Sequence, residues 1–110
     1  MTLLKRCGFG LAVLMIVTVY PQISFSETFK SSEFLTWKPE SQSYYIRVSV
    51  RMAALVSARQ NKVHSSCIDR WYFSDPQNGD KTLLSAMRKN AEFHPQAIIV
   101  GMIQKECGNF

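Results

Sequence analysis

The sequence predicts an all-α protein, a small four- or five-helix bundle cross-linked by one disulfide. Three observations lead to this prediction. Apolar residues recur at helical spacing along much of the chain, prolines stand where helices can begin, and two cysteines remain after an N-terminal segment that we expect to be removed. The chain has 110 residues, of which 46% are apolar, so it can form one small domain and no more.

The N-terminal segment has the composition of a secretory signal peptide. Basic residues at positions 5–6 precede an apolar run over residues 8–20, and small residues occupy positions 24 and 26, as a cleavage site requires. We therefore expect cleavage after Ser26. This division makes residues 1–26 a signal peptide and residues 27–110 a single helical domain, which is periplasmic or secreted.

Two alternatives to a cleaved signal are weaker on physical grounds. An uncleaved membrane anchor needs about 20 apolar residues, whereas Pro21 interrupts the run early. A lipid-modified cysteine would follow the apolar run, whereas Cys7 precedes it. Removing residues 1–26 deletes two basic residues and lowers the net charge from +5 to +3. So mild a charge does not predict a nucleic-acid partner, and we expect no stable membrane insertion once the signal is removed.

The expected mature chain contains two cysteines, Cys67 and Cys107, which lie 40 residues apart. A domain of this size is marginal without a cross-link, and an even cysteine pair in an oxidising compartment indicates a disulfide. Closing this loop is worth about 4 kcal/mol in the chain-entropy model. The alternative is a metal site shared with His64 and His94, but these spacings match no zinc-finger pattern. We therefore expect no metal and no cofactor.

A short helix is expected after Ser31 or Ser32, either of which can act as its N-cap. Phe34 and Trp37 share one face of this segment because they are three residues apart. Pro39 ends the turn, since the residue before a proline disfavours helical backbone. The same proline suits the first position of the next helix.

The longest periodic segment runs from Pro39 to about Gln60. Its apolar residues recur at helical spacing, and we expect this stripe to face the core. The stripe consists of Tyr45, Val48, Met52, Leu55 and Val56, and it is widened by Ile46, Val50 and Ala53. Residues 46–50 alternate like a strand, but the helix formers over residues 51–55 and the total length favour a helix.

The next segment, residues 67–73, is expected to form a short helix that begins at the cysteine. It buries Ile68 together with either Trp71 or Tyr72. A loop is expected over residues 74–79, because Asp-Pro and Asn-Gly are turn-forming pairs.

Two more helices complete the predicted bundle. Asp80 is placed to cap the first of them, and its inward residues are Leu83, Leu84 and Met87. The chain breaks at residues 93–95. Pro95 opens the last helix, which ends at Cys107 and whose apolar stripe is formed by Ile98, Ile99, Met102 and Ile103.

No catalytic constellation is recognisable, since the sequence has no glycine-rich phosphate loop, paired-histidine metal motif or glycine-flanked nucleophilic serine. Serines and the two histidines of the mature chain supply a nucleophile and a base in principle, but nothing in their spacing places them together. We therefore expect that the protein is not an enzyme. His94 is expected to cap or pack at the helix break, although its titration range also allows a pH-sensing role.

Four residues are candidates for binding another protein. Tyr44, Arg47 and Arg51 succeed one another on the long helix at spacings of three and four residues, and Trp71 adds a large aromatic side chain. Such residues often anchor protein interfaces. The alternatives are a solvated helix face for the arginines and a place in the core for the tryptophan. We expect another protein as the partner, whereas the oligomeric state and the binding face do not follow from the sequence.

The order of features from Ser32 to the C-terminus resembles the small exported immunity proteins of type VI secretion, the Rap/Tai family. The shared outline is a short Phe-Leu helix, the segment over residues 42–46 that opens a long helix, then Cys67, the pair His94-Pro95 and a final helix that ends in Cys107. This resemblance implies a helical, disulfide-bonded periplasmic protein that binds and blocks a toxin delivered by a neighbouring cell.

A second resemblance is to the HdeA-type acid-stress chaperones, which are also small, helical, exported and built around one disulfide. It implies a protein that loses tertiary structure in strong acid and binds unfolded clients. A third possibility is an envelope protein of unknown role. An immunity protein forms a tight complex with one toxin, whereas a chaperone protects many clients and does so only in acid.

Overall fold

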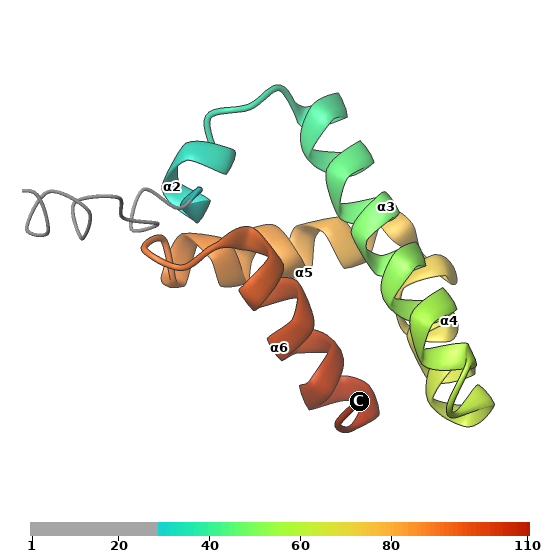
Figure 1. Cartoon of the computed structure of the whole chain (residues 1–110). Coiled ribbons are helices and arrows are strands. Elements are labelled where there is room, and N and C mark those ends of the chain that lie inside the picture. Colours follow the sequence, from blue (N-terminus) through green and yellow to red (C-terminus); the bar gives the residue numbers. More distant parts are fainter. Residues whose placement is uncertain (1–28) are drawn as a thin grey trace, which may run out of the picture.

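The computed structural model describes residues 29–110, which form five helices (Figure 1). They are α2 (Ser31–Phe34), α3 (Pro39–Ala58), α4 (Lys62–Phe73), α5 (Pro76–Lys89) and α6 (Pro95–Cys107). This part of the chain contains no strand, so the predicted all-α class is confirmed. The predicted signal peptide lies outside the described residues.

The long helix α3 and α4 form an antiparallel hairpin, and α5 and α6 pack against it (Figure 1). The short turn between α3 and α4 ends at Asn61, whose side chain caps α4 by accepting a hydrogen bond from the His64 backbone N–H at 3.1 Å. The last helix contacts α3, α4 and α5. Consequently α6 closes the bundle, and its C-terminal end lies near the turn of the hairpin.

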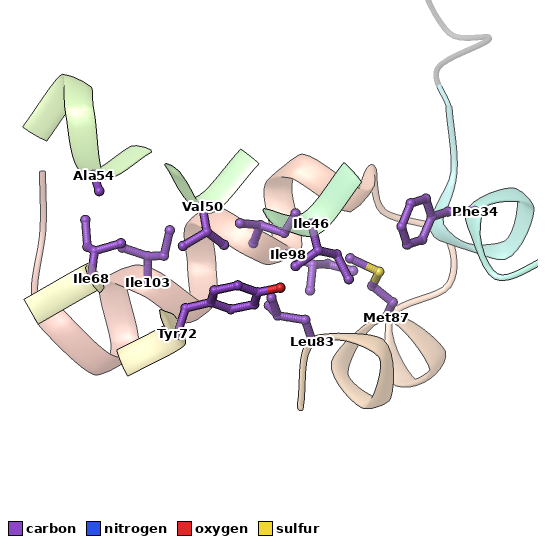
Figure 2. Close-up of a cluster of buried hydrophobic side chains, with 11 residues drawn as sticks. Phe34, Ile46, Val50, Ala54, Ile68, Tyr72, Leu83, Met87, Ile98 and Ile103 are labelled. Carbon is purple, nitrogen blue, oxygen red and sulfur yellow. The ribbon is translucent and has the colours of Figure 1, made fainter. Parts of the chain in front are cut away.

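All five helices contribute to a single apolar core (Figure 2). Its side chains are fully or almost fully buried, and burying each large one is worth about 1.5–3 kcal/mol. They are Phe34 from α2, Ile46, Val50 and Ala54 from α3, Ile68 and Tyr72 from α4, Leu83 and Met87 from α5, and Ile98, Ile99 and Ile103 from α6. The inward residues predicted for the last two helices are therefore confirmed, with Leu84 and Met102 partly buried beside the core.

The inward face predicted for the long helix is only partly confirmed: Ile46 and Val50 are in the core, and Tyr45 and Ala53 pack against it. The core receives Ile46, Val50 and Ala54, whereas Val48, Met52, Leu55 and Val56 are exposed. Apolar residues recur at helical spacing on both sides of α3, so periodicity alone does not predict which side faces the core. The side with small residues faces α4 because it allows close approach: the Ser65 hydroxyl donates to the Ala54 carbonyl at 2.8 Å.

The loop predicted over residues 74–79 is also wrong, because α5 already begins at Pro76. Asp75, not Asp80, is the N-cap, and its side chain accepts a hydrogen bond from the Asn78 N–H at 3.3 Å. An Asp N-cap followed by proline at the first helical position is a strong start for a helix. Gly79 therefore lies inside the helix, where it contacts the ring of Tyr72.

Two other helix starts differ from the prediction. Helix α4 begins at Lys62, well before Cys67, because Asn61 supplies an effective cap. Helix α2 has Lys30 at its N-cap position, without a side-chain capping bond, instead of a serine. Ser31 is buried inside α2, and its hydroxyl donates to the Phe93 carbonyl at 2.8 Å.

The predicted disulfide is confirmed. Cys67 on α4 and Cys107 at the end of α6 are bonded, and their Cα atoms lie 5.7 Å apart. The bond therefore joins the hairpin to the final helix at the C-terminal end of the bundle. Cys107 also packs against the core, so the disulfide and the core packing both stabilise the contact between α4 and α6.

Candidate protein-binding surface

An open aromatic hollow lies between the first half of α3 and the start of α6. It is lined by Trp37, Glu40, Ser41, Tyr44, Tyr45, Val48, Ser49 and Gln96. Trp37 remains 39% exposed although it contacts other rings, with centroid distances of 5.2 Å to Phe29 and 5.0 Å to Phe34. Aromatic rings held in this way offer contact area at little cost in conformational entropy.

The side of α3 that faces solvent is apolar, and we call it the outer face. It comprises Tyr44, Val48, Met52, Leu55 and Val56, whose exposed fractions range from 44% to 69%. Large contiguous apolar patches on a protein surface mark interaction sites more often than chance.

A second hollow extends this surface toward the C-terminus. Val100 and Phe110 line it together with Met52 and Val56 of the outer face. It adjoins the aromatic hollow at Ser49, whose hydroxyl accepts a hydrogen bond from the Gln96 side chain at 2.6 Å. An apolar strip therefore extends from the turn before α3 to the last residue of the chain.

Of the four residues predicted to bind a partner, Tyr44, Arg47 and Arg51 are exposed on successive turns of α3, whereas Trp71 lies on α4. Tyr44 lies on the outer face and is 69% exposed. Arg47 is exposed and its guanidinium lies 3.4 Å from the Ser43 hydroxyl, within α3. Arg51 pairs with Asp69 of α4, as described next. Trp71 is partly buried on α4, one turn after Cys67. Of the four, only Tyr44 lines a hollow of the strip, and that hollow is the aromatic one.

The Arg51 side chain is held on the flank of α3 that faces α4. Its Nη1 atom lies 3.2 Å from a carboxylate oxygen of Asp69, and its guanidinium lies 3.8 Å from the centre of the Phe73 ring. Both interactions occur at exposed sites, where each is worth about 1 kcal/mol or less. Through these two interactions the Arg51 guanidinium binds residues of α4 and points away from the outer face.

Sequence reasoning missed most of the apolar strip. The periodicity predicts Val48, Met52, Leu55 and Val56 in the core. Trp37 belongs to a group of large aromatic residues of which most are expected in the core and an exposed one marks an interface. One available indication was that α3 carries apolar residues on two sides, at residues 46, 50 and 54 as well as at 48, 52 and 55–56. Only one of two such sides can face a core of this size.

A hydrogen-bond network beside the core joins α3, α4 and α5. The Tyr72 hydroxyl donates to one carboxylate oxygen of Asp80, and the Ser43 hydroxyl donates to the other at 2.7 Å. Burial, and then the bond to the Asp80 carboxylate, raise the pKa of the Tyr72 phenol well above its usual value. Asp80 therefore has a structural role inside α5 in place of the predicted capping role.

Ser57 and His64 are close together, although nothing in their sequence spacing indicated this. The His64 Nδ1 atom lies 2.5 Å from the Ser57 hydroxyl, and its Nε2 atom lies 2.9 Å from the Gly108 carbonyl. A carbonyl can only accept, so Nε2 donates to it and Nδ1 accepts from the serine. Both side chains are buried, and together they join the hairpin to the C-terminal tail.

His94 caps α6, as the sequence suggested. Its Nδ1 atom accepts a hydrogen bond from the Gln96 backbone N–H at 3.0 Å, and its ring contacts Phe29 edge to face at 5.6 Å. Within residues 29–110, no three His, Cys, Asp or Glu side chains lie close enough to hold a metal ion. None of the helices in this range is long and apolar enough to cross a membrane.

Comparison with protein-family models, curated proteins and solved structures finds no match to this chain. The two resemblances noted in the sequence therefore remain expectations. The function is inferred from the surface described above and from the order of features along the chain.

Proposed function

We propose that the protein is an exported, non-catalytic binding protein that acts through the apolar strip between α3 and α6. Its most concrete form is an immunity or inhibitor protein that neutralises a secreted toxin. The observation that carries this proposal is the outer face of α3 with the adjoining aromatic hollow. A small domain with a disulfide and a filled core leaves five large apolar residues of one helix exposed.

The chemistry of the strip supports binding to another protein. Trp37 and Tyr44 are residue types that dominate the binding energy of protein interfaces. Polar groups, including Glu40 and Gln96, also line the aromatic hollow and can supply the hydrogen bonds that such interfaces need. The folded scaffold loses little conformational entropy on binding.

Binding can be tested with the mature protein as bait in an envelope extract that contains the candidate toxin. We expect a stoichiometric complex, and we expect Trp37→Ala and Tyr44→Ala each to weaken it by about 1–2 kcal/mol, as interface anchors do. Val63→Ala is the matched control, because Val63 is 79% exposed on α4 and lies outside the strip. Recovery of no stoichiometric partner would count against the inhibitor function.

An acid-stress chaperone is the second candidate function, because an exposed apolar face also suits unfolded clients. The two functions differ in their pH dependence. Protection of client proteins from aggregation only in strong acid, without a specific partner at neutral pH, would favour the chaperone. A role as an envelope protein is the remaining alternative.

The proposed export makes a separate prediction. Mass spectrometry of the periplasmic protein is expected to find Glu27 at the N-terminus and the disulfide oxidised. The reason is the order of basic, apolar and small residues in the first 26 positions. Membrane-bound protein that still starts with Met1 would contradict this part of the proposal.

A further inference from the structure

Helix α3 carries apolar side chains on two sides, and only one of them is covered. Ile46 and Val50 are completely buried on the inner side, while the outer face is exposed from Tyr44 to Val56, over a little more than three turns. The helix also carries exposed charged residues, among them Glu40, Arg47 and Arg51, but the five apolar residues of the outer face are exposed together. A contiguous exposed apolar patch of this kind is typical of a surface that binds a partner.

The apolar residues on this side of α3 are arranged symmetrically about position 50. Val48 and Met52 lie two positions to either side, and Tyr44 and Val56 lie six positions to either side. Leu55 has its counterpart in Tyr45, which is partly buried. Two identical helices that pack antiparallel about a two-fold axis at this position place each member of a pair against the other member in the second copy. Every apolar residue of the face then opposes another apolar residue.

The charges of α3 fit the same antiparallel arrangement. Glu40 lies in the first turn and Arg59 directly follows the last turn, and both are exposed. With the axis at position 50, antiparallel packing places Glu40 of one copy opposite Gln60 of the other, one residue from Arg59, whereas parallel packing brings like charges together. Arg51, the charged residue nearest the axis, is paired with Asp69 and held on the flank toward α4.

We infer that the outer face of α3 binds a second copy of this chain, forming a two-fold symmetric dimer in which the two α3 helices pack antiparallel. The inference deepens the proposed function, since it rests on the same exposed face and names one of its partners. The aromatic hollow then lies at the end of the dimer interface, where Trp37 and Gln96 can meet a target protein.

The test is sedimentation equilibrium of the purified mature protein, with its disulfide intact and no target present. The expected result is a concentration-dependent dimer. Met52→Glu should raise its dissociation constant at least about tenfold, because it places an unpaired charge against Val48 of the second copy. Val63→Glu makes the same kind of change at an exposed valine outside the face and should leave the constant unchanged.

The orientation is tested by exchanging the end charges. Glu40→Arg and Arg59→Glu should each weaken the dimer about two- to fivefold at low salt, as exposed ion pairs do, and the double variant should restore it. A protein that stays monomeric at millimolar concentration, or a dimer unaffected by Met52→Glu, would overturn the inference. A monomer that still captures a toxin would overturn the inferred dimer but not the proposed function. A dimer that captures no other protein would contradict the proposed function but not the dimer.

Discussion

His64 joins three segments of the molecule through the two nitrogens of one ring. It accepts from Ser57 on α3 and donates to Gly108 after α6, and its ring contacts Phe110 edge to face at 5.0 Å. The bond to Ser57 is buried and the bond to Gly108 is partly buried, so the folded structure shields both from water. The residue therefore contributes to the position of the C-terminal tail as well as to the hairpin.

Replacing His64 by alanine is expected to lower the free energy of unfolding by about 2–3 kcal/mol. The change leaves the buried Ser57 hydroxyl without its acceptor, and a buried polar group that loses its partner costs about 1–3 kcal/mol in addition to the lost packing. Urea unfolding followed by circular dichroism measures the loss. Ser66→Ala, at an exposed position of the same helix, should change stability by less than about 0.5 kcal/mol; equal stabilities for the two variants would show that the His64 bonds contribute nothing.

Tyr72 gives the protein a specific weakness in alkali. Its phenol has a raised pKa in the folded state, whereas in the unfolded chain it ionises near pH 10. The folded state therefore favours the neutral phenol, and the resulting stability is fully present below about pH 10 and is lost as pH rises from there toward the folded pKa.

Stability of wild type and Tyr72→Phe should accordingly be compared from pH 8 to pH 11.5. Above about pH 10 the wild type is expected to lose up to about 1.4 kcal/mol per pH unit more than the variant, which has no phenol at this position. Tyr44 and Tyr45 are present in both proteins, so their ionisation cancels in the difference. Parallel pH profiles would mean that Tyr72 titrates normally in the folded state.

At the scale of the helix, Gly79 shows how a turn-forming residue can be required inside α5. A Cβ atom at this position would lie 2.6 Å from Cδ2 of the Tyr72 ring, which is itself buried and bonded to Asp80. Glycine is unfavourable by about 1 kcal/mol inside a helix. The close approach of α4 and α5 therefore explains its presence better than a turn does.

Gly79→Ala is expected to destabilise the protein by about 1–2 kcal/mol, because the cost of overpacking, about 1–3 kcal/mol, exceeds the gain in helix propensity. Gly101→Ala is the matched control. Gly101 lies inside α6, and a Cβ atom added there would have no neighbouring atom within 4 Å, so alanine should stabilise by about 0.5–1 kcal/mol. Thermal unfolding of both variants tests the pair, and a stabilising Gly79→Ala would show that Tyr72 moves aside freely.

The helices themselves follow largely from local sequence, whereas their orientation does not. Pro39 and Pro95 mark helix starts because proline suits the first turn and excludes helical backbone before it. The outward direction of Val48 and Met52 depends on where α4 can approach α3 most closely, which is a property of two helices together. The same holds for the candidate site. Residue type and helical spacing indicate Tyr44, but the groups that surround it also come from α6 and from the turn at Trp37.

At the scale of the whole molecule, two bonds join the hairpin to the end of α6. The disulfide connects Cys67 to Cys107, and one turn earlier on α4 His64 donates to Gly108. The disulfide holds the tail near the histidine, so the hydrogen bond forms at a low entropic cost. Without the disulfide, the tail must be ordered before the same bond can form.

A double-mutant cycle is expected to detect this dependence. Replacing both Cys67 and Cys107 by serine should lower the free energy of unfolding by about 3–4 kcal/mol. Residual structure in the unfolded chain reduces this loss. His64→Ala should then cost less in the serine background than in the disulfide-bonded protein, by about 0.5–1 kcal/mol, because the bond to Gly108 is already weakened there. Urea unfolding of the four proteins measures the coupling free energy. Strict additivity would mean that the tail finds His64 without the disulfide, in which case the core contacts of Ile103 alone are enough to position the end of α6.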